Sequence, residues 1–99
     1  MNIRITVVKQ AIHTDLIEKY ENPIQHTCTL KVGDYFISQN GQKPSGLCEE
    51  AWKSMKDFVE ALNRGEKNFF DGWMKNPESA MISCNDGFRP VSFYIEVIK

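Results

Sequence analysis

The sequence predicts a two-layer α+β fold, in which a mostly antiparallel sheet of three to five strands packs on one long amphipathic helix. Two patterns predict this class. Apolar residues recur at three- and four-residue steps over residues 46–64, the period of a helix with one buried face. Apolar and polar residues alternate near both ends of the chain, the period of a strand. A small half-open barrel closed by the helix is the alternative. Residues 1–99 form one domain in either case.

The first strand and a short helix are predicted near the start of the chain. Residues 2–8 form the strand, because apolar side chains alternate there with Arg4 and Thr6. Thr14 is a good N-cap for a helix of less than two turns, which Pro23 brings to an end. Residues 27–38 are rich in β-formers but are interrupted at Gly33, so they predict two short strands or one bulged strand.

The central helix is predicted from about Gly46 to Arg64. Ser45 is its N-cap, acidic residues in the early turns suit the helix dipole, and Gly65 suits the C′ position. The residues on its apolar face are Leu47, Cys48, Ala51, Trp52, Met55, Phe58, Val59 and Leu62.

A hairpin is predicted at the end of the sequence. Residues 80–84 and 91–98 form its strands, with a tight turn at residues 85–87. The second strand places Val91, Phe93, Ile95 and Val97 toward the helix.

Composition narrows the classes of function. Hydrophobic residues make up 41% and charged residues 25%, as in ordinary globular domains. Twelve basic residues against thirteen acidic ones give a net charge of −1, which disfavours nucleic acid as a partner. The chain has neither the apolar run of a signal peptide nor one that could span a bilayer, so a cytoplasmic protein is expected. Three cysteines then indicate free thiols, metal ligands or reactive groups rather than disulfides.

Cys48 is the first candidate for a chemical role. It is predicted about three residues into the central helix, where unpaired N–H groups and the positive end of the dipole stabilise a thiolate. It also falls on the apolar face, so the competing interpretation is a buried cysteine that packs in the core.

The other cysteines suggest a metal site. His26 and Cys28 point the same way on an extended chain, and Cys84 ends a strand at the hairpin turn. If these segments meet the start of the central helix, His26, Cys28, Cys48 and Cys84 offer a tetrahedral Zn²⁺ set. Three cysteines alone could hold an iron–sulfur cluster. No Cys-x-x-Cys pair supports a metal, so three structural thiols and thiol redox chemistry stay open.

Arg89 and four aromatic residues are candidate binding groups. Arg89 is predicted to pair with Asp86 across its own turn, or else to bind a carboxylate or a thiolate. Aromatic residues could line a small-molecule pocket or form core and lid; they are Trp52, Phe69, Phe70 and Trp73. Motifs of hydrolases and nucleotide-binding proteins are absent, so the sequence does not decide whether the protein is an enzyme.

Three motifs together resemble a family of small, uncharacterised prokaryotic proteins of about this length. They are Lys31-Val32-Gly33-Asp34-x-Phe36, Pro44-x-Gly46-Leu47-Cys48-x-x-Ala51 and Cys84-x-Asp86-Gly87-x-Arg89-Pro90-Val91-x-Phe93. The resemblance implies that the three cysteines act together, and it implies no reaction. Only Thr29 and Leu30 separate Cys28 from the first motif, a shorter spacer than the family's, so His26 is the substitute for a histidine found there.

The leading hypothesis is therefore a metal- or thiol-based site near the start of the central helix. The rival hypothesis is a non-catalytic binding module or accessory subunit, in which the aromatic patch at residues 69–74 contacts a protein partner or a second copy of the chain.

Overall fold

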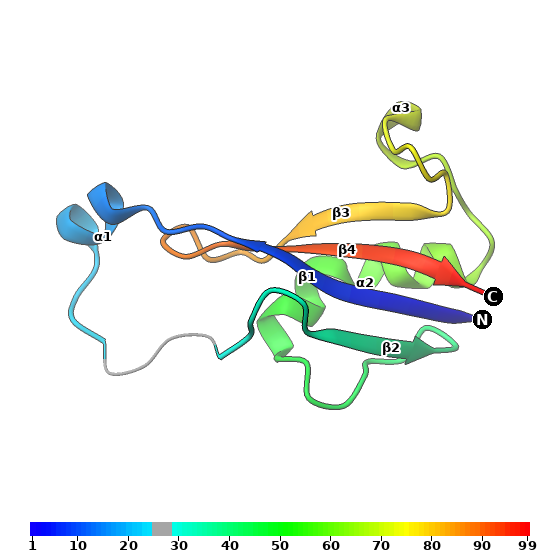
Figure 1. Cartoon of the computed structure of the whole chain (residues 1–99), viewed down its shortest axis with the longest axis horizontal. Helices are drawn as coiled ribbons and strands as arrows, with labels where there is room; N and C mark the ends of the chain where they lie inside the picture. Colours follow the sequence, from blue (N-terminus) through cyan, green and yellow to red (C-terminus); the bar gives the residue numbers. More distant parts are fainter. Residues whose placement is uncertain (25–28) are drawn as a thin grey trace.

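The computed structural model describes residues 1–24 and 29–99, and it confirms an α+β fold with an antiparallel sheet. The four strands lie in the order β2-β1-β4-β3, with β2 and β3 as open edges, so the barrel alternative does not form. Figure 1 shows the arrangement. The strands are β1 (Asn2–Gln10), β2 (Tyr35–Gln39), β3 (Ser79–Ser83) and β4 (Val91–Ile98), and the helices are α1 (Thr14–Tyr20), α2 (Glu49–Asn63) and α3 (Phe69–Gly72).

The two central strands, β1 and β4, come from opposite ends of the chain. Their antiparallel register sets Ile5 opposite Ile95 and Val7 opposite Phe93, and all four side chains are fully buried. A bulge after Val7 shifts the register by one residue near the end of β1. The predicted alternation in both strands is therefore confirmed, because the apolar set of each faces the same side of the sheet.

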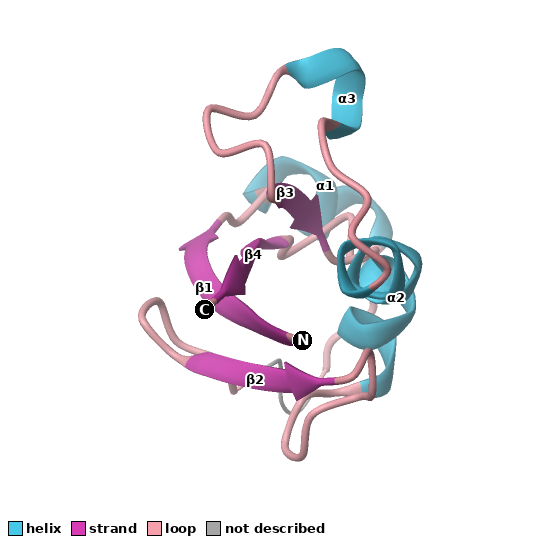
Figure 2. Ribbon diagram, turned by 90° about the vertical axis from the view of Figure 1, so that its right-hand side faces the viewer, coloured by secondary structure: helices cyan, strands magenta, loops and turns pink. Residues whose placement is uncertain are grey.

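Helix α2 packs against that buried side, as Figure 2 shows. Its apolar stripe meets the inward residues of β1, β3 and β4 and closes a single core. The buried residues that α2 contributes are Ala51, Trp52, Met55, Val59, Ala61 and Leu62. The opposite face of the helix carries its charged residues, so α2 is held by the burial of one side.

The two ends of α2 differ in how well the sequence predicts them. The C-terminus agrees, because Gly65 has φ of 89° and its N–H bonds the carbonyl of Leu62, while the N–H of Glu66 bonds that of Ala61. These two bonds form a Schellman motif. The N-terminus is wrong by three residues. The helix begins at Glu49 with Cys48 as N-cap, because residues 45–46 form a turn in which Gly46 has φ of 88°.

The region before α2 also differs from the prediction. A single strand, β2, begins after Gly33 and runs to Gln39, whereas the described residues before it form a turn. Gly33 has φ of 99°, which stops a strand from continuing through it. The other residues of the predicted segment, 27–28, lie outside the described residues.

Helix α1 extends from one end of the sheet and has no buried residue (Figure 1). His13 rather than Thr14 is its N-cap residue, and the N–H of His13 bonds the carbonyl of Phe88. A seven-residue helix without tertiary burial has little stability of its own. Its attachment to the loop before β4 therefore decides where it sits.

Helix α3 is a short turn on the loop between α2 and β3. Phe70 and Asp71 have φ of 55° and 56°, a left-handed conformation that is rare for large side chains. Phe58 of α2 holds this turn, since its ring lies 5.5 Å from that of Phe69 and 5.6 Å from that of Phe70. Trp73, the next aromatic residue, is 82% exposed.

Among the described residues, no helix has both the length and the apolar character needed to cross a membrane.

Replacing Gly65 by Ala is expected to lower the free energy of unfolding by about 1 kcal/mol, because a side chain disfavours the left-handed conformation. Urea unfolding measures the change. Gly87→Ala is the matched control, since Gly87 is not left-handed and an added Cβ meets no atom within 4 Å. Equal losses in the two variants would contradict the Schellman ending of α2.

Candidate functional site

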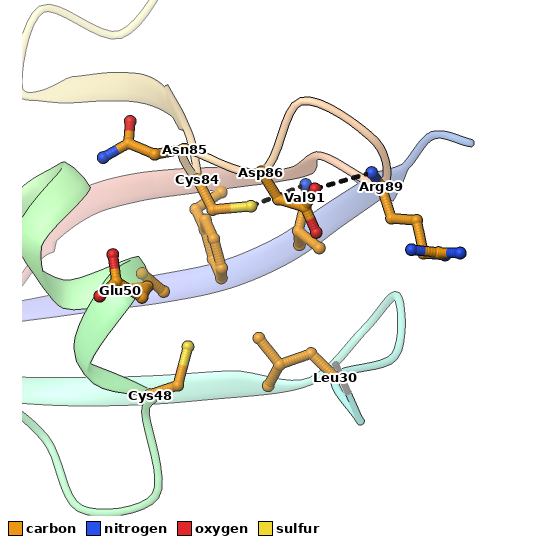
Figure 3. A pocket seen from close by; sticks show the side chains of 10 residues that line it. Leu30, Cys48, Glu50, Cys84, Asn85, Asp86, Arg89 and Val91 are labelled. Carbon is orange, nitrogen blue, oxygen red and sulfur yellow. Dashed lines mark hydrogen bonds between the residues drawn. The ribbon is translucent and has the colours of Figure 1, made fainter. Parts of the chain in front are cut away.

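A pocket of about 250 Å³ lies between the N-terminus of α2 and the connection from β3 to β4. Both Cys48 and Cys84 line it, although they are far apart in the sequence (Figure 3). The pocket is lined by Leu30, Cys48, Glu50, Ala51, Cys84, Asn85, Asp86, Arg89, Val91 and Phe93. Two of the three predicted cysteines are thus at one site, and apolar side chains supply much of the wall between them.

Cys48 reaches the pocket because α2 begins later than predicted. As the N-cap it has an extended backbone, with φ of −70° and ψ of 153°, and it is exposed. The preceding residue, Leu47, is buried in the core and anchors the chain there. The prediction that Cys48 packs on the apolar stripe is therefore wrong, and its sulfur points into the pocket in Figure 3.

Cys84 continues the hairpin by one residue beyond β3. Its N–H bonds the carbonyl of Val91 at 2.9 Å, as an antiparallel ladder requires. In return, the N–H of Val91 donates to Sγ of Cys84, at 3.2 Å, rather than to a carbonyl. The thiol therefore ends the ladder and is held in a fixed direction, half-buried, on the wall opposite Cys48 (Figure 3).

Arg89 does not pair with Asp86 across its turn. Its Nη2 lies 2.9 Å from Oε1 of Glu21 and its Nη1 lies 3.1 Å from Oε2, a bidentate pair with the end of α1. Oδ1 of Asp86 instead accepts the backbone N–H groups of Phe88 and Arg89, which shapes the turn. The pair has side chains only 24% and 13% exposed. The prediction that Arg89 pairs with Asp86 is therefore wrong, and its partner is Glu21.

The Glu21 carboxylate also affects the protonation of Arg89. The hydrogen bond to Glu21 is the largest influence, and it raises the pKa of the guanidinium above its usual value, with a smaller contribution from Asp86. Arg89 therefore carries its full positive charge at any working pH. Its charge is matched by that of Glu21.

The remaining predicted site residues do not join this pocket. Trp52 is 8% exposed and belongs to the core, Phe70 packs on Phe58, and Trp73 is exposed on the loop between α2 and β3. His26 and Cys28 lie outside the described residues. Across residues 1–24 and 29–99, no three His, Cys, Asp or Glu side chains are grouped so as to hold a metal ion. The predicted metal set therefore stays a prediction.

Two residues that line the pocket, Leu30 and Glu50, were missed by the sequence analysis, as was Glu21, the partner of Arg89. Glu21 lies 68 positions from Arg89, and no pattern in the sequence joins the two. Leu30 is placed by the side-chain amide of Gln10, which donates a hydrogen bond to its carbonyl. Glu50 is visible in the sequence only as an early acidic residue of the helix.

Comparisons of the chain with protein-family models, with curated proteins and with solved structures found no match. The resemblance of the three motifs to a prokaryotic family stays a prediction, and the site is interpreted from its own chemistry.

The pocket combines an accessible thiol, a half-buried thiol and an apolar wall. Its volume suits a small molecule, since sites for larger ligands usually have about 300 Å³ or more. Thiols in this setting can exchange with a disulfide or bind a soft metal ion.

Cys84→Ala is expected to lower the free energy of unfolding by about 1 kcal/mol, because it leaves the N–H of Val91 without an acceptor. Cys84→Ser, which keeps an acceptor, should lose less. Urea unfolding and the exchange rate of the Val91 amide measure the effect. Cys48→Ala is the control, since Cys48 makes no side-chain capping bond in the structure. A loss as large in this control would contradict the structural role of Cys84.

Proposed function

We propose that the protein carries out thiol–disulfide exchange with a small disulfide in the pocket of Cys48 and Cys84. The placement of both thiols on one pocket is the observation that carries the proposal. Cys48 and Cys84 are 36 positions apart, so their place on one small pocket results from the tertiary fold and not from closeness in the sequence. A structural role explains Cys84, whose sulfur accepts a hydrogen bond, but gives no reason for the exposed thiol of Cys48.

The two thiols have different roles in the proposed reaction. Cys48 is the attacking thiol, because it is exposed and is the N-cap of a fifteen-residue helix. Cys84 is the resolving thiol, because it is less exposed and lies across the same pocket. Each assignment follows from the access of the sulfur to an incoming molecule.

The steps balance in atoms and electrons. The Cys48 thiolate attacks one sulfur of the disulfide R–S–S–R, forming a mixed disulfide and releasing one RS⁻. The Cys84 thiolate then attacks the Cys48 sulfur, forming a Cys48–Cys84 disulfide and releasing the second RS⁻. The substrate is reduced by two electrons and the protein is oxidised by two. A dithiol reductant returns the protein to its starting state.

The metal hypothesis is distinguished by composition. An iron–sulfur cluster would need Cys28 beside Cys48 and Cys84, and a tetrahedral zinc site would take His26 as its fourth ligand. Elemental analysis of anaerobically purified protein addresses it, because a metal held by the whole set is lost on substitution of any one cysteine.

A second candidate function is a contact with a partner through the loop that carries α3. The observation that favours it is Trp73, which follows α3 directly and is 82% exposed. Large aromatic side chains at such positions are enriched in protein interfaces. The partner would be another protein or a second copy of this chain.

The exchange reaction is tested with bis(2-hydroxyethyl) disulfide, in proteins that also carry Cys28→Ser so that two thiols remain. The unaltered pair is expected to release two equivalents of thiol and to lose two mass units. Cys84→Ser should release one equivalent and retain the mixed disulfide, and Cys48→Ser should react at least tenfold more slowly. Thiol release and intact-protein mass are the measurements.

Two results would contradict this proposal. Equal rates with and without Cys48 would exclude it as the attacking thiol, and a stable mixed disulfide with both cysteines present would exclude Cys84 as the resolving one. Stoichiometric zinc or iron, lost in both Cys28→Ser and Cys48→Ser, would favour the metal site instead.

Trp73→Ser is expected to leave stability nearly unchanged, because the side chain is exposed. If Trp73 forms a contact between copies, sedimentation velocity should show association for the natural protein and its loss in the variant. Tyr20→Ser is the control, since Tyr20 is a similarly exposed aromatic residue, on α1. Association that persists in Trp73→Ser would remove this contact.

A further inference from the structure

We infer that the pocket selects small disulfides that are cationic or neutral and discriminates against anionic ones. This inference rests on the proposed exchange reaction and names its substrate class. It is carried by the charges around the two thiols and by the ion pair of Arg89, the cation among the described pocket residues, with Glu21.

Two carboxylates line the pocket from opposite sides. Glu50 belongs to the first turn of α2, next to Cys48, and Asp86 belongs to the connection that begins at Cys84 (Figure 3). Oδ1 of Asp86 accepts hydrogen bonds from the backbone N–H groups of Phe88 and Arg89 and not from a cationic side chain. A ligand that extends between the thiols therefore meets negative charge on both sides.

Among the described residues that line the pocket, Arg89 is the only positively charged one. Glu21 holds its guanidinium at 2.9 Å and 3.1 Å, and Figure 3 shows the side chain extending away from both sulfurs. Because the two charges cancel, the pair presents almost no field to a ligand. The carboxylates of Glu50 and Asp86 then decide the sign of the potential in the pocket.

Other positive groups nearby are weaker. Nζ of Lys53 lies 3.6 Å from Oε1 of Glu50, and both side chains are about two-thirds or more exposed, so solvent screens the carboxylate as well as the ammonium. The N-terminus of α2 contributes roughly half a positive charge. These groups reduce the negative potential without reversing it, because Arg89, the cation that interacts with Asp86, is already paired with Glu21. The expected selectivity is therefore modest.

The volume of the pocket limits the size of the substrate. About 250 Å³ accommodates a small molecule, and a larger disulfide would have to leave most of its atoms outside the pocket. The inferred class is thus a low-molecular-weight disulfide with amine or hydroxyl substituents.

Three disulfides of similar length test the preference of the pocket for the charge of its substrate. They are cystamine, which is cationic, bis(2-hydroxyethyl) disulfide, which is neutral, and 3,3′-dithiodipropionate, which is anionic. Each rate with Cys48 is divided by the rate of the same disulfide with N-acetylcysteine amide, a thiol without a carboxylate, which corrects for differences in intrinsic reactivity. The corrected rate for cystamine is expected to exceed that for dithiodipropionate by about threefold to tenfold at low salt, and the ratio should fall as salt is added.

Two variants of the same ion pair separate charge from structure. Glu21→Gln leaves the charge of Arg89 unmatched and should lower the cationic preference about threefold. Arg89→Gln leaves Glu21 unmatched and should raise it by a similar factor. Both variants break the same contact, so a purely structural effect would move the preference in the same direction in both.

Glu66→Gln is the control for a general change of protein charge, because Glu66 lies beyond the far end of α2 and pairs with Arg64. It should leave the preference unchanged. Rates that depend on Cys48 but not on the charge of the disulfide would overturn this inference and leave the exchange reaction intact. If no disulfide reacts through Cys48, both fail.

Discussion

The antiparallel pairing of β1 with β4 is the constraint on which the rest of the structure depends. It joins the two ends of the chain at the centre of the sheet and places Ile5, Val7, Phe93 and Ile95 on one buried face. A slip of one residue would turn each of these side chains to the other face and expose the core. This register therefore determines which side of the sheet α2 covers. The start of α2 then forms one wall of the pocket on that side.

The position of the two thiols follows from that register through short steps. Because β3 pairs with β4, Ile82 lies opposite Phe93, and Cys84 falls opposite Val91 at the end of the ladder. Helix α2 packs on the same face, and its N-cap, Cys48, lines the same pocket as Cys84. Neither thiol is placed by a contact of its own with the other. The pocket is a result of where the hairpin ends and the helix begins.

The sequence predicted those parts of the fold that depend on local pattern. Alternation identified both central strands, and Gly65 marked the end of α2, because only glycine adopts that conformation without strain. The prediction of where α2 begins was wrong, because a serine and a glycine at residues 45–46 are typical of a helix cap and of a turn alike. The predicted start placed Cys48 on the apolar face of the helix, whereas in the structure Cys48 is the N-cap and lines the pocket. The prediction of the partner of Arg89 was wrong for another reason. Glu21 is distant from Arg89 in the sequence, and the two side chains meet only through the fold of the whole chain.

The ion pair of Glu21 and Arg89 serves two parts of the molecule at once. Helix α1 has no buried residue, so its position rests on backbone bonds around His13 and on this pair. The same pair cancels the positive charge at the edge of the pocket. Attachment of the helix and the electrostatic potential at the thiols are therefore two consequences of one contact. An anion that competed for Arg89 would have to displace Glu21, so the repulsion of anionic ligands and the position of α1 have a common physical cause.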